Sequence, residues 1–396
     1  MLSGKTYGEM TKVPRGAVAL AFVLLLCTLT VVAAAGNAAI SDGQDTIVSN
    51  ANSTNHLSPP SSDVSGQAYQ RVSMDVSSSA TVAAQEIHNE HDSQTLDRNL
   101  HSKDEHTQRD TAQEQLDTIH DRLESLDRQQ RHLLNQYSEG GISSQRLVRE
   151  LIVIQVVIDA QSELLERTMQ RAEPSDEFRV RLETLRDAIS IEQPVVDRLQ
   201  DVLADGDDPT TVYVQTAEDS LVLAMVDEDV HLRQATLLTE RNVTGEDQFG
   251  DDFSPGGYSE AQKRMEALYP WAYSLPNLNI GGDTLSVYSQ IYQLGLDHPH
   301  GTLTAYFDGA TTNIFHENQR LSLRAVPTET TLTNTTDERR LTVHTTRETG
   351  PINVTVGADG SAVAGATVEI DGQIVGTTDS EGTLWTVQPM CGFEVA

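Results

Sequence analysis

Lysine is almost absent from this sequence of 396 residues, and only Lys103 and Lys263 lie beyond residue 35. The chain carries 27 lysine and arginine residues against 59 aspartate and glutamate residues, a formal net charge of −32. A polyanion of this kind repels nucleic acids and anionic membrane surfaces, so we expect neither as a partner. An acidic surface with little lysine stays hydrated in concentrated salt, where the screening length falls to about 3 Å at 1 M. The composition predicts a halophile protein, with an ordinary acidic secreted protein as the alternative.

Long hydrophobic runs are also scarce, and only residues 16–35 are apolar over the length needed to cross a bilayer, about 20 residues. Lys5, Lys12 and Arg15 precede this run, and three alanines end it before Gly36. A basic flank, an apolar core and small residues are typical of a secretory signal peptide. Residues 1–35 are therefore predicted to be a signal peptide or, alternatively, an uncleaved anchor. In both cases we expect the rest of the chain to be exported, as a cell-surface, membrane-anchored or secreted protein.

Cysteine occurs twice, at Cys27 and Cys391. If the N-terminal segment is cleaved, one thiol remains and no intramolecular disulfide can form. A structural zinc site built from several cysteines is excluded by this count. We predict no cofactor.

Apolar residues are few between residues 36 and 108, where serine, asparagine, aspartate, glutamine and histidine dominate. Such a composition buries too little apolar surface to offset the entropy lost on ordering. We predict a disordered, low-complexity spacer over 36–108, with a helix starting near its end. Its five histidines have no regular spacing, so we interpret them as ordinary polar residues rather than as metal ligands.

Helical periodicity begins near Asp110. Apolar residues step by three and four from Leu116 to Tyr137 and again from Leu147 to Leu165, with two glycines between the runs. This pattern predicts an antiparallel helical hairpin. Two shorter helices are expected to follow, the second after Pro194. We assign 109–205 to a coiled-coil-like hairpin or bundle that could act as a stalk.

Two glutamines interrupt the apolar positions of this helical region. Gln130 and Gln161 are compatible with register control in an oligomeric coiled coil, and equally with pairing inside one chain. An oligomer formed through the helical segment is therefore one possibility.

The period changes to two after Pro209, and 206–349 is predicted to be a mixed α/β domain. One strand is expected on each side of the polar segment TAED, which would form the turn between them. Eleven of the 19 aromatic residues lie between Phe249 and Phe315, which places a compact core there. LYPWAYSLP is interpreted as an ordered loop. LTAYF and ATTNIF form a candidate hairpin around Asp308 and Gly309, and RLSLRAV adds a further strand.

Strand and turn patterns fill the last segment, 350–396. ATVEI and QIVGTT flank Asp371 and Gly372, a favoured hairpin turn. The segment resembles the carboxypeptidase-regulatory or transthyretin-like β-sandwich repeats of surface proteins. The positions that carry the resemblance are Val363, Gly365, Ala366, Val368, Asp371, Gly372, Gly376, Thr378, Asp379 and Gly382. It implies an Ig-like structural module and says nothing about activity. A full sandwich needs about seven strands, so we expect an incomplete one or pairing with another chain.

The whole layout also resembles uncharacterised exported or membrane-associated haloarchaeal proteins. These combine a signal, a low-complexity spacer, a helical hairpin, a mixed domain and a β-sandwich. The overall expectation is thus a multidomain α+β protein. The resemblance carries no functional residues.

One group of residues could build a metal site. His298 and His300 flank Pro299, and His316 or Asp308 could supply a third ligand across the predicted hairpin. The proline and the following glycine are equally typical of an ordinary turn, which we favour over a metal centre. No established metal-binding, serine-hydrolase or nucleotide-binding motif is present.

Two other kinds of site have sequence support. Tyr269, Trp271 and Tyr273 alternate like a stacking platform for a sugar, although core packing is favoured. Four sequons mark candidate glycosylation sites, of which we expect Asn334 to be the most exposed; the candidates are Asn52, Asn242, Asn334 and Asn353.

The preferred hypothesis is a non-enzymatic, structural or binding protein of a halophile's cell envelope. Its expected partners are cell-envelope components or other surface proteins, and the membrane if the N-terminal segment is uncleaved. The first alternative is an extracytoplasmic sensor or regulator held by that anchor. The second is a secreted metal-dependent hydrolase that uses His298, His300 and either His316 or Asp308.

Overall fold

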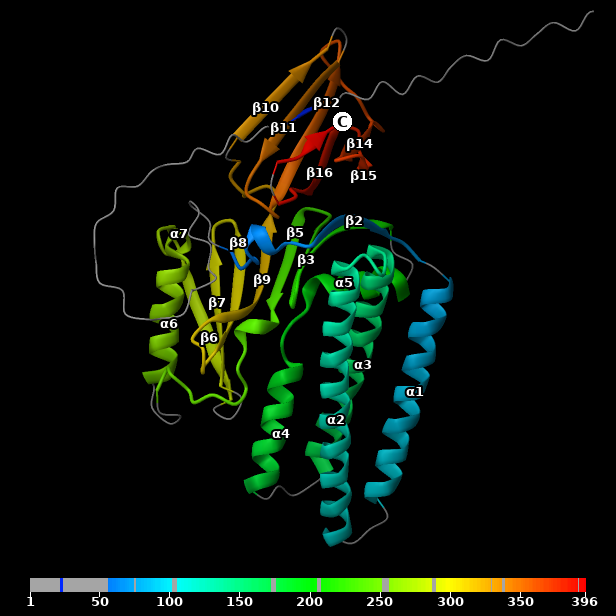
Figure 1. Cartoon of the computed structure of the whole chain (residues 1–396), viewed down its shortest axis with the longest axis vertical. Helices are drawn as coiled ribbons and strands as arrows, with labels where there is room; N and C mark the ends of the chain where they lie inside the picture. Colours follow the sequence, from blue (N-terminus) through cyan, green and yellow to red (C-terminus); the bar gives the residue numbers. More distant parts are fainter. Residues whose placement is uncertain are drawn as a thin grey trace, which may run out of the picture.

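Three parts follow one another along the long axis of the molecule in the computed structural model (Figure 1): a layer of helices, a large β-sheet and a smaller β-rich unit. The structure describes residues 22–23, 56–74, 76–101, 105–171, 176–204, 208–250, 256–286, 290–328, 330–336, 339–390 and 392–396. Apart from residues 22–23, the predicted signal peptide or anchor lies outside this range. No helix in the part that the structure describes has the length and apolar character needed to span a bilayer.

Five helices form the first part, which we call the helical layer. They are α1 (Val76–His101), α2 (Glu105–Ser138), α3 (Ser144–Arg171), α4 (Asp176–Ile189) and α5 (Pro194–Ala204). Helix α3 packs against the other four, because its middle is apolar almost all round. The apolar residues that recur along α2 are buried, among them Leu116, Ile119, Leu126 and Leu133. Gly140, at a φ of 73°, ends α2 in a left-handed turn that glycine adopts without steric cost.

The prediction of a disordered spacer over 36–108 is wrong for the part that the structure describes. Besides α1, this part contains η1 (Ser61–Asp63) and β2 (Gly66–Val72), and β2 pairs along its whole length with the next strand. A strand at a sheet edge is held by backbone hydrogen bonds, which do not depend on a hydrophobic composition. Helix α1 needs few apolar residues because Val82 and Leu96 meet the apolar surfaces of its neighbours.

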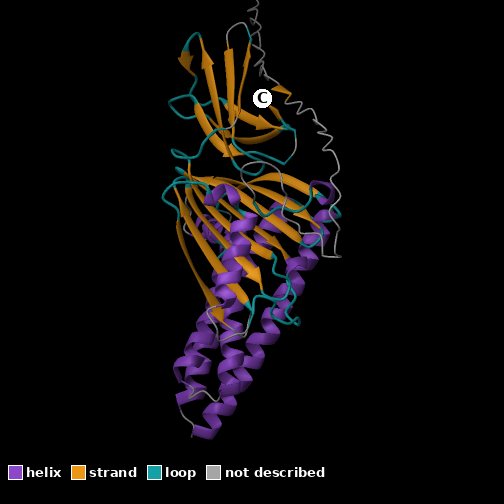
Figure 2. Ribbon diagram, turned by 90° about the vertical axis from the view of Figure 1, so that its left-hand side faces the viewer, coloured by secondary structure: helices purple, strands orange, loops and turns teal. Residues whose placement is uncertain are grey.

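The second part is an antiparallel sheet of eight strands in the order β2-β3-β4-β5-β9-β8-β7-β6. Its further strands are β3 (Thr210–Ala217), β4 (Ser220–Asp227), β5 (Val230–Leu237), β6 (Asn279–Ser286), β7 (Ile291–His298), β8 (Gly301–Asp308) and β9 (Ile314–Ser322). The helical layer extends away from this sheet in the side view (Figure 2).

Both faces of the sheet are covered. Alternate residues such as Val214, Leu223 and Leu232 pack with α2, α3 and α5 on one face. On the opposite face Val222 and Phe307 belong to a core shared with α6 (Gly256–Leu268) and α7 (Pro270–Tyr273). This double burial explains why β4 is apolar at nearly every position, SLVLAMV, instead of alternating.

Some predicted turns and loops differ from the structure. The polar turn expected at TAED is present but shorter than predicted: Ala217 still belongs to β3 and pairs with Ser220, so the turn contains only Glu218 and Asp219. The hairpin of β8 and β9 is also present, but residues 309–313 form a longer loop that Asp308 caps through the Thr311 N–H at 2.8 Å. RLSLRAV is not a separate strand, because its first residues continue β9. The predicted loop LYPWAYSLP contains the one-turn helix α7.

The third part is a β-sandwich that starts at β10 rather than at residue 350. One sheet contains β10 (Thr330–Thr335), β11 (Arg339–Thr345), β12 (Pro351–Ala358), β13 (Ser361–Ala362) and β16 (Thr383–Val387). The other contains β14 (Thr367–Ile370), β15 (Gln373–Thr377), β17 (Glu394–Val395) and the short β1 (Phe22–Val23). Residues of both sheets, among them Ile352 and Ile370, share one core. The hairpin turn at Asp371 and Gly372 is confirmed.

The sandwich contacts the large sheet through β2, β3 and β4. Tyr69 donates its hydroxyl to the carbonyl of Val387 at 2.6 Å, and its ring lies 5.3 Å from that of Tyr213. The hydroxyl of Tyr213 in turn accepts from the N–H of Met390 at 3.2 Å. One face of the sheet is therefore covered by two different parts of the chain. Helices α6 and α7 lie over one half of this face, and the sandwich lies over the other half.

Candidate functional site

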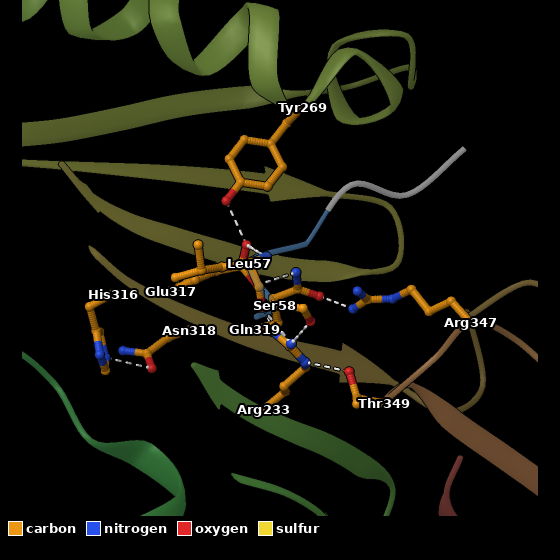
Figure 3. A network of polar contacts seen from close by, with 10 residues as sticks. All are labelled: Leu57, Ser58, Arg233, Tyr269, His316, Glu317, Asn318, Gln319, Arg347 and Thr349. Atoms are coloured by element: carbon orange, nitrogen blue, oxygen red, sulfur yellow. Dashed lines mark hydrogen bonds and ion pairs between the residues drawn. The ribbon is translucent and has the colours of Figure 1, made fainter. Parts of the chain in front are cut away.

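A buried ion pair occupies the place where these two covers meet (Figure 3). Arg233 of β5 donates from Nη1 to Oε1 of Glu317 on the neighbouring strand β9, at 2.9 Å, and neither side chain is exposed to solvent. Burial lowers the pKa of the Arg233 guanidinium, and the Glu317 carboxylate opposes that shift. A buried charge is tolerated when it is paired and its remaining hydrogen-bonding positions are filled.

The second carboxylate oxygen of Glu317 is also filled. It accepts from the Tyr269 hydroxyl at 2.5 Å and from the Leu57 N–H at 2.8 Å. Burial, followed by the negative charge of Glu317, raises the pKa of Tyr269 well above its usual value. Tyr269 therefore stays protonated and acts as a donor that holds the carboxylate.

Arg233 connects three distant parts of the chain. Its Nη2 donates to the carbonyl of Leu57 at 2.6 Å and to the hydroxyl of Ser58 at 2.9 Å, while Nε donates to the hydroxyl of Thr349 at 2.8 Å. Leu57 and Ser58 precede β2, and Thr349 lies between the sandwich strands β11 and β12. The guanidinium therefore fixes the N-terminal segment and the sandwich to the centre of the sheet.

The network continues to a cavity through two further side chains. Gln319 donates from Nε2 to Oε1 of Glu317 at 2.9 Å, which turns its amide oxygen toward Arg347 as acceptor. Gln319 and Arg347 both line the cavity, whose volume is about 210 Å³. Its apolar wall is formed by α7, the strand β9 and the loop after it, through Trp271, Leu275, Leu321, Val326 and Pro327.

His298 supplies the buried polar group of this cavity. Its ring contacts Trp271 edge-on, with 5.2 Å between the ring centroids, and its Nδ1 accepts from the backbone N–H of His300 at 3.3 Å. Burial is the main cause that lowers the pKa of His298 to about 4, with smaller contributions from His300 and Arg347. The imidazole is therefore neutral at pH 7 and carries its proton on Nε2.

The candidate metal ligands do not meet, in keeping with the ordinary turn that the sequence analysis favours. His298 and His300 lie at the turn between β7 and β8, whereas His316 faces Tyr306, five residues further along β8 and roughly 17 Å away at the rise of a strand. Asp308 lies at the opposite end of β8, where it caps the loop. Among the residues that the structure describes, no group of three histidine, cysteine, aspartate or glutamate side chains could hold a metal ion.

Both ring nitrogens of His316 are hydrogen-bonded to neighbouring groups of the chain. Its Nδ1 lies 2.7 Å from the Thr236 hydroxyl, and its Nε2 lies 3.0 Å from the carbonyl of Glu192 and 3.1 Å from Oδ1 of Asn318. Two acceptors at Nε2 require the proton there, so Thr236 donates to Nδ1. Burial lowers the pKa of His316 to about 4.

The three aromatic residues proposed as a stacking platform are divided between two environments. Tyr269 is fully buried in the core and bonded to Glu317, so it is not a surface for a sugar. Trp271 lines the cavity instead, and Tyr273 packs at the edge of the core beneath α6.

The candidate glycosylation sites differ in accessibility. Asn242 is exposed, in the loop after β5, whereas Asn334 on β10 is half-buried, so the expectation that Asn334 is the most exposed is wrong. Asn353 is half-buried on β12, between β11 and β16. Asn52 lies outside the described residues.

The sequence interpretation missed Arg233, Glu317 and Gln319. A signal was present, because charged and amide residues stand inside the strand sequences VHLRQATL and IFHENQRL, between residues that are apolar. Among 59 acidic residues, however, one buried glutamate cannot be recognised without its partner.

Family comparisons divide the chain near the boundary between the helical layer and the sheet. A domain of unknown function (DUF7096) matches residues 10–209, which is just over half of the chain. The chain belongs to this family. A second family of unknown function (DUF7094) matches residues 212–327, and an archaeal fibronectin-III type-like domain matches residues 330–396. The DUF7096 segment supplies the edge strand β2 to the sheet that the DUF7094 segment builds.

The fibronectin-III type match covers the C-terminal sandwich and gives it an Ig-like fold. The match confirms the β-sandwich expected from the sequence. The matching family is fibronectin-III type-like, whereas the sequence analysis noted a resemblance to carboxypeptidase-regulatory or transthyretin-like repeats. Searches of curated proteins and of solved structures found no significant match.

Proposed function

We propose that this chain is a non-enzymatic structural or binding protein of the cell envelope of a halophilic archaeon. In this proposal the helical layer is a stalk or assembly element, and the sheet holds the fibronectin-III type-like unit at the opposite end. The expected partners are cell-envelope components or other surface proteins.

The observation that carries the proposal is that the Arg233 guanidinium bonds only to groups of the chain itself in the described structure. An arginine and a glutamate buried in a protein centre are candidates for chemistry, yet every nitrogen of this guanidinium bonds to a group of the chain itself. Those groups come from the N-terminal segment, the sheet and the sandwich, so the bonds favour one rigid body over independently moving domains. Rigid attachment suits a protein that presents one end at a fixed distance from the other.

Two features of the sequence support the location. The apolar run 16–35 has the character of an export signal or anchor, and the acidic, lysine-poor composition suits a surface in concentrated salt. The separation of His298, Asp308 and His316 removes the ligand set on which the metal-dependent hydrolase hypothesis depended.

The test is the intact mass and N-terminal sequence of the protein recovered from the envelope, medium and cytoplasm of its native host. A start near Gly36 in the envelope or medium would support a surface or released protein. An intact Met1 in the membrane fraction would favour the anchored sensor or regulator. Recovery of the uncleaved chain from the cytoplasm would overturn the proposal.

A further inference from the structure

We propose that the cavity beside Trp271 binds a small organic carboxylate with an apolar body. The inference goes beyond the structural role proposed above and does not depend on it. Three properties of the cavity define the ligand: an unused buried donor, a guanidinium in the lining and an apolar wall of limited volume.

The donor is Nε2 of His298. This side chain is more than nine-tenths buried, and its Nδ1 is occupied by the backbone N–H of His300, so the ring proton lies on Nε2. Nε2 itself is buried without a hydrogen-bond partner in the described structure. Leaving a buried donor unsatisfied costs free energy that a ligand oxygen would recover.

The charge around the cavity favours an anion. Arg347 lines it, and Arg233 lies behind it in the same network, while the single carboxylate of Glu317 accepts from Arg233 and from Gln319. The guanidinium of Arg347 lowers the pKa of His298, and Asp297, an exposed residue on β7, opposes it. Arg347 thus places a guanidinium in the cavity wall, and the described residues that line the cavity include no aspartate or glutamate.

The apolar part of the lining disfavours a strongly hydrated anion. Trp271, Leu275, Leu321, Val326 and Pro327 offer no charge and no side-chain hydrogen-bonding group beyond the indole N–H donor. A cavity of about 150 Å³ holds a benzene ring, so about 210 Å³ leaves room for one ring with a short carboxylate arm. The expected pose has the body against Trp271 and the carboxylate at His298 and Arg347.

The probe is phenylacetate, compared with phenylacetamide, which has nearly the same shape and no charge. Both are titrated into the full chain at fixed ionic strength, and Trp271 emission is followed in a Trp385→Phe background, which leaves one tryptophan. We expect saturable quenching by phenylacetate and an affinity at least tenfold weaker for the amide. Absence of a saturable response to phenylacetate, or equal affinity for the two compounds, would overturn the proposal.

Variants separate the polar contacts from general charge. Arg347→Gln and His298→Ala should each weaken phenylacetate binding at least fivefold, and His298→Gln, which keeps an N–H donor, should weaken it less. The matched control is Arg324→Gln, which removes an exposed arginine of the neighbouring loop that does not line the cavity. If this control weakens binding as much as Arg347→Gln, the cavity is not the site.

A third variant tests the location without touching a polar group. Val326→Phe places a ring into the cavity from the partly exposed loop after β9, and it should abolish quenching while the far-UV circular dichroism stays unchanged. Unchanged phenylacetate binding in this folded variant would contradict the proposal. This test also applies if a His298 variant fails to fold.

Discussion

Arg233 and Glu317 are neighbours across β5 and β9, with 2.9 Å between Nη1 and Oε1 and no solvent exposure of either side chain. Their strands are adjacent in the middle of the eight-stranded sheet, where both faces are covered. The pair therefore lies in the covered centre of the sheet. Its hydrogen-bonding partners come from the N-terminal segment, from Tyr269 just before α7, from Gln319 on β9 and from Thr349 in the sandwich.

Removing one member of this pair should be costly. Glu317→Gln leaves the Arg233 charge buried without a counter-charge, so we expect a loss of about 3–5 kcal/mol in the free energy of unfolding. The measurement is urea denaturation followed by circular dichroism. The double variant Arg233→Met with Glu317→Leu should lose less than the sum of the two single variants, because it leaves no charge unpaired.

The matched control is the exposed ion pair on α6. Glu260 accepts from Lys263 at 2.6 Å, and both side chains are more than half exposed. Glu260→Gln should change stability by less than about 1 kcal/mol. An equal effect of Glu260→Gln and Glu317→Gln would contradict the importance that we give to burial.

Strands β4 and β5 show which parts of the fold can be predicted from the sequence and which cannot. SLVLAMV predicts β4 correctly, because a short apolar run between turns has few other structures available. The next strand, β5, was missed, because His231, Arg233 and Gln234 break the apolar pattern. Arg233 and Gln234 are bonded to groups far away in the sequence, Arg233 to Glu317 and Gln234 to the N-terminus of α5. The local pattern carries no information about those groups.

The candidate site follows the same division. The sequence singled out His298 and Trp271 for their chemistry, and both line the cavity. It could not predict that Arg347 lies beside them, because Arg347 comes from the connection between two sandwich strands. Nor could it separate His316 from His298, since the register of β8 and β9 decides their distance.

Gly301 should be sensitive to replacement. It follows the turn between β7 and β8 at a φ of 148°, and a Cβ there would overlap the carbonyl oxygen of Arg320 on β9. Gly301→Ala must shift the backbone of β8 or β9, so we expect a loss of at least about 2 kcal/mol in stability. Urea denaturation of the full chain measures it.

Gly140→Ala is the control for this prediction. Gly140 also has a positive φ, of 73°, but a Cβ there would meet nothing within 4 Å. The left-handed strain alone should cost about 1 kcal/mol. If the two variants lose the same stability, the close approach of Gly301 to Arg320 is not what constrains this turn.

Acid should destabilise the fold through His316. Its pKa is about 4 in the folded protein against 6.5 for an ordinary histidine, so the folded state binds fewer protons between these values. The stability it contributes is therefore complete above pH 6.5 and is lost as the pH falls toward 4. The difference in pKa corresponds to about 3 kcal/mol.

The measurement compares the wild type with His316→Gln in urea at pH 7, 6, 5 and 4. The wild type should be the more stable at pH 7, and its advantage should shrink by about 3 kcal/mol at pH 4. Asp197, whose pKa burial raises to about 6, acts in the opposite direction in both proteins and cancels in the difference. Parallel stability curves would show that His316 is not protonated on unfolding.

Glycosylation in the native host should favour Asn242. Its side chain is exposed beside the equally exposed Thr244, whereas Asn353 is half-buried between two neighbouring strands. Asn242→Gln should remove one glycan from the intact mass of the purified protein, and Asn353→Gln should leave the mass unchanged apart from the substitution. A glycan lost with Asn353→Gln would mean that modification precedes folding of the sandwich.

Stability should also depend on salt, and a group of carboxylates indicates where. Asp197 of α5 remains accessible to solvent, and after partial desolvation the causes that raise its pKa are the like charges of Asp159, Asp201 and Glu192. At low ionic strength these charges repel one another, whereas at about 1 M the screening length falls to roughly 3 Å and the repulsion is weakened. We expect the circular dichroism of the fold to persist in molar potassium chloride and to be lost as the salt is diluted.

Asp197→Asn should move the midpoint of this salt titration to a lower concentration, because it removes one charge from the group. Glu381→Gln, which removes an exposed charge in a sandwich turn, is the matched control and should move the midpoint less. A circular dichroism signal that stays constant down to 0.1 M salt would contradict the halophile interpretation. Equal shifts for the two variants would assign the salt dependence to the net charge of −32 as a whole rather than to this group.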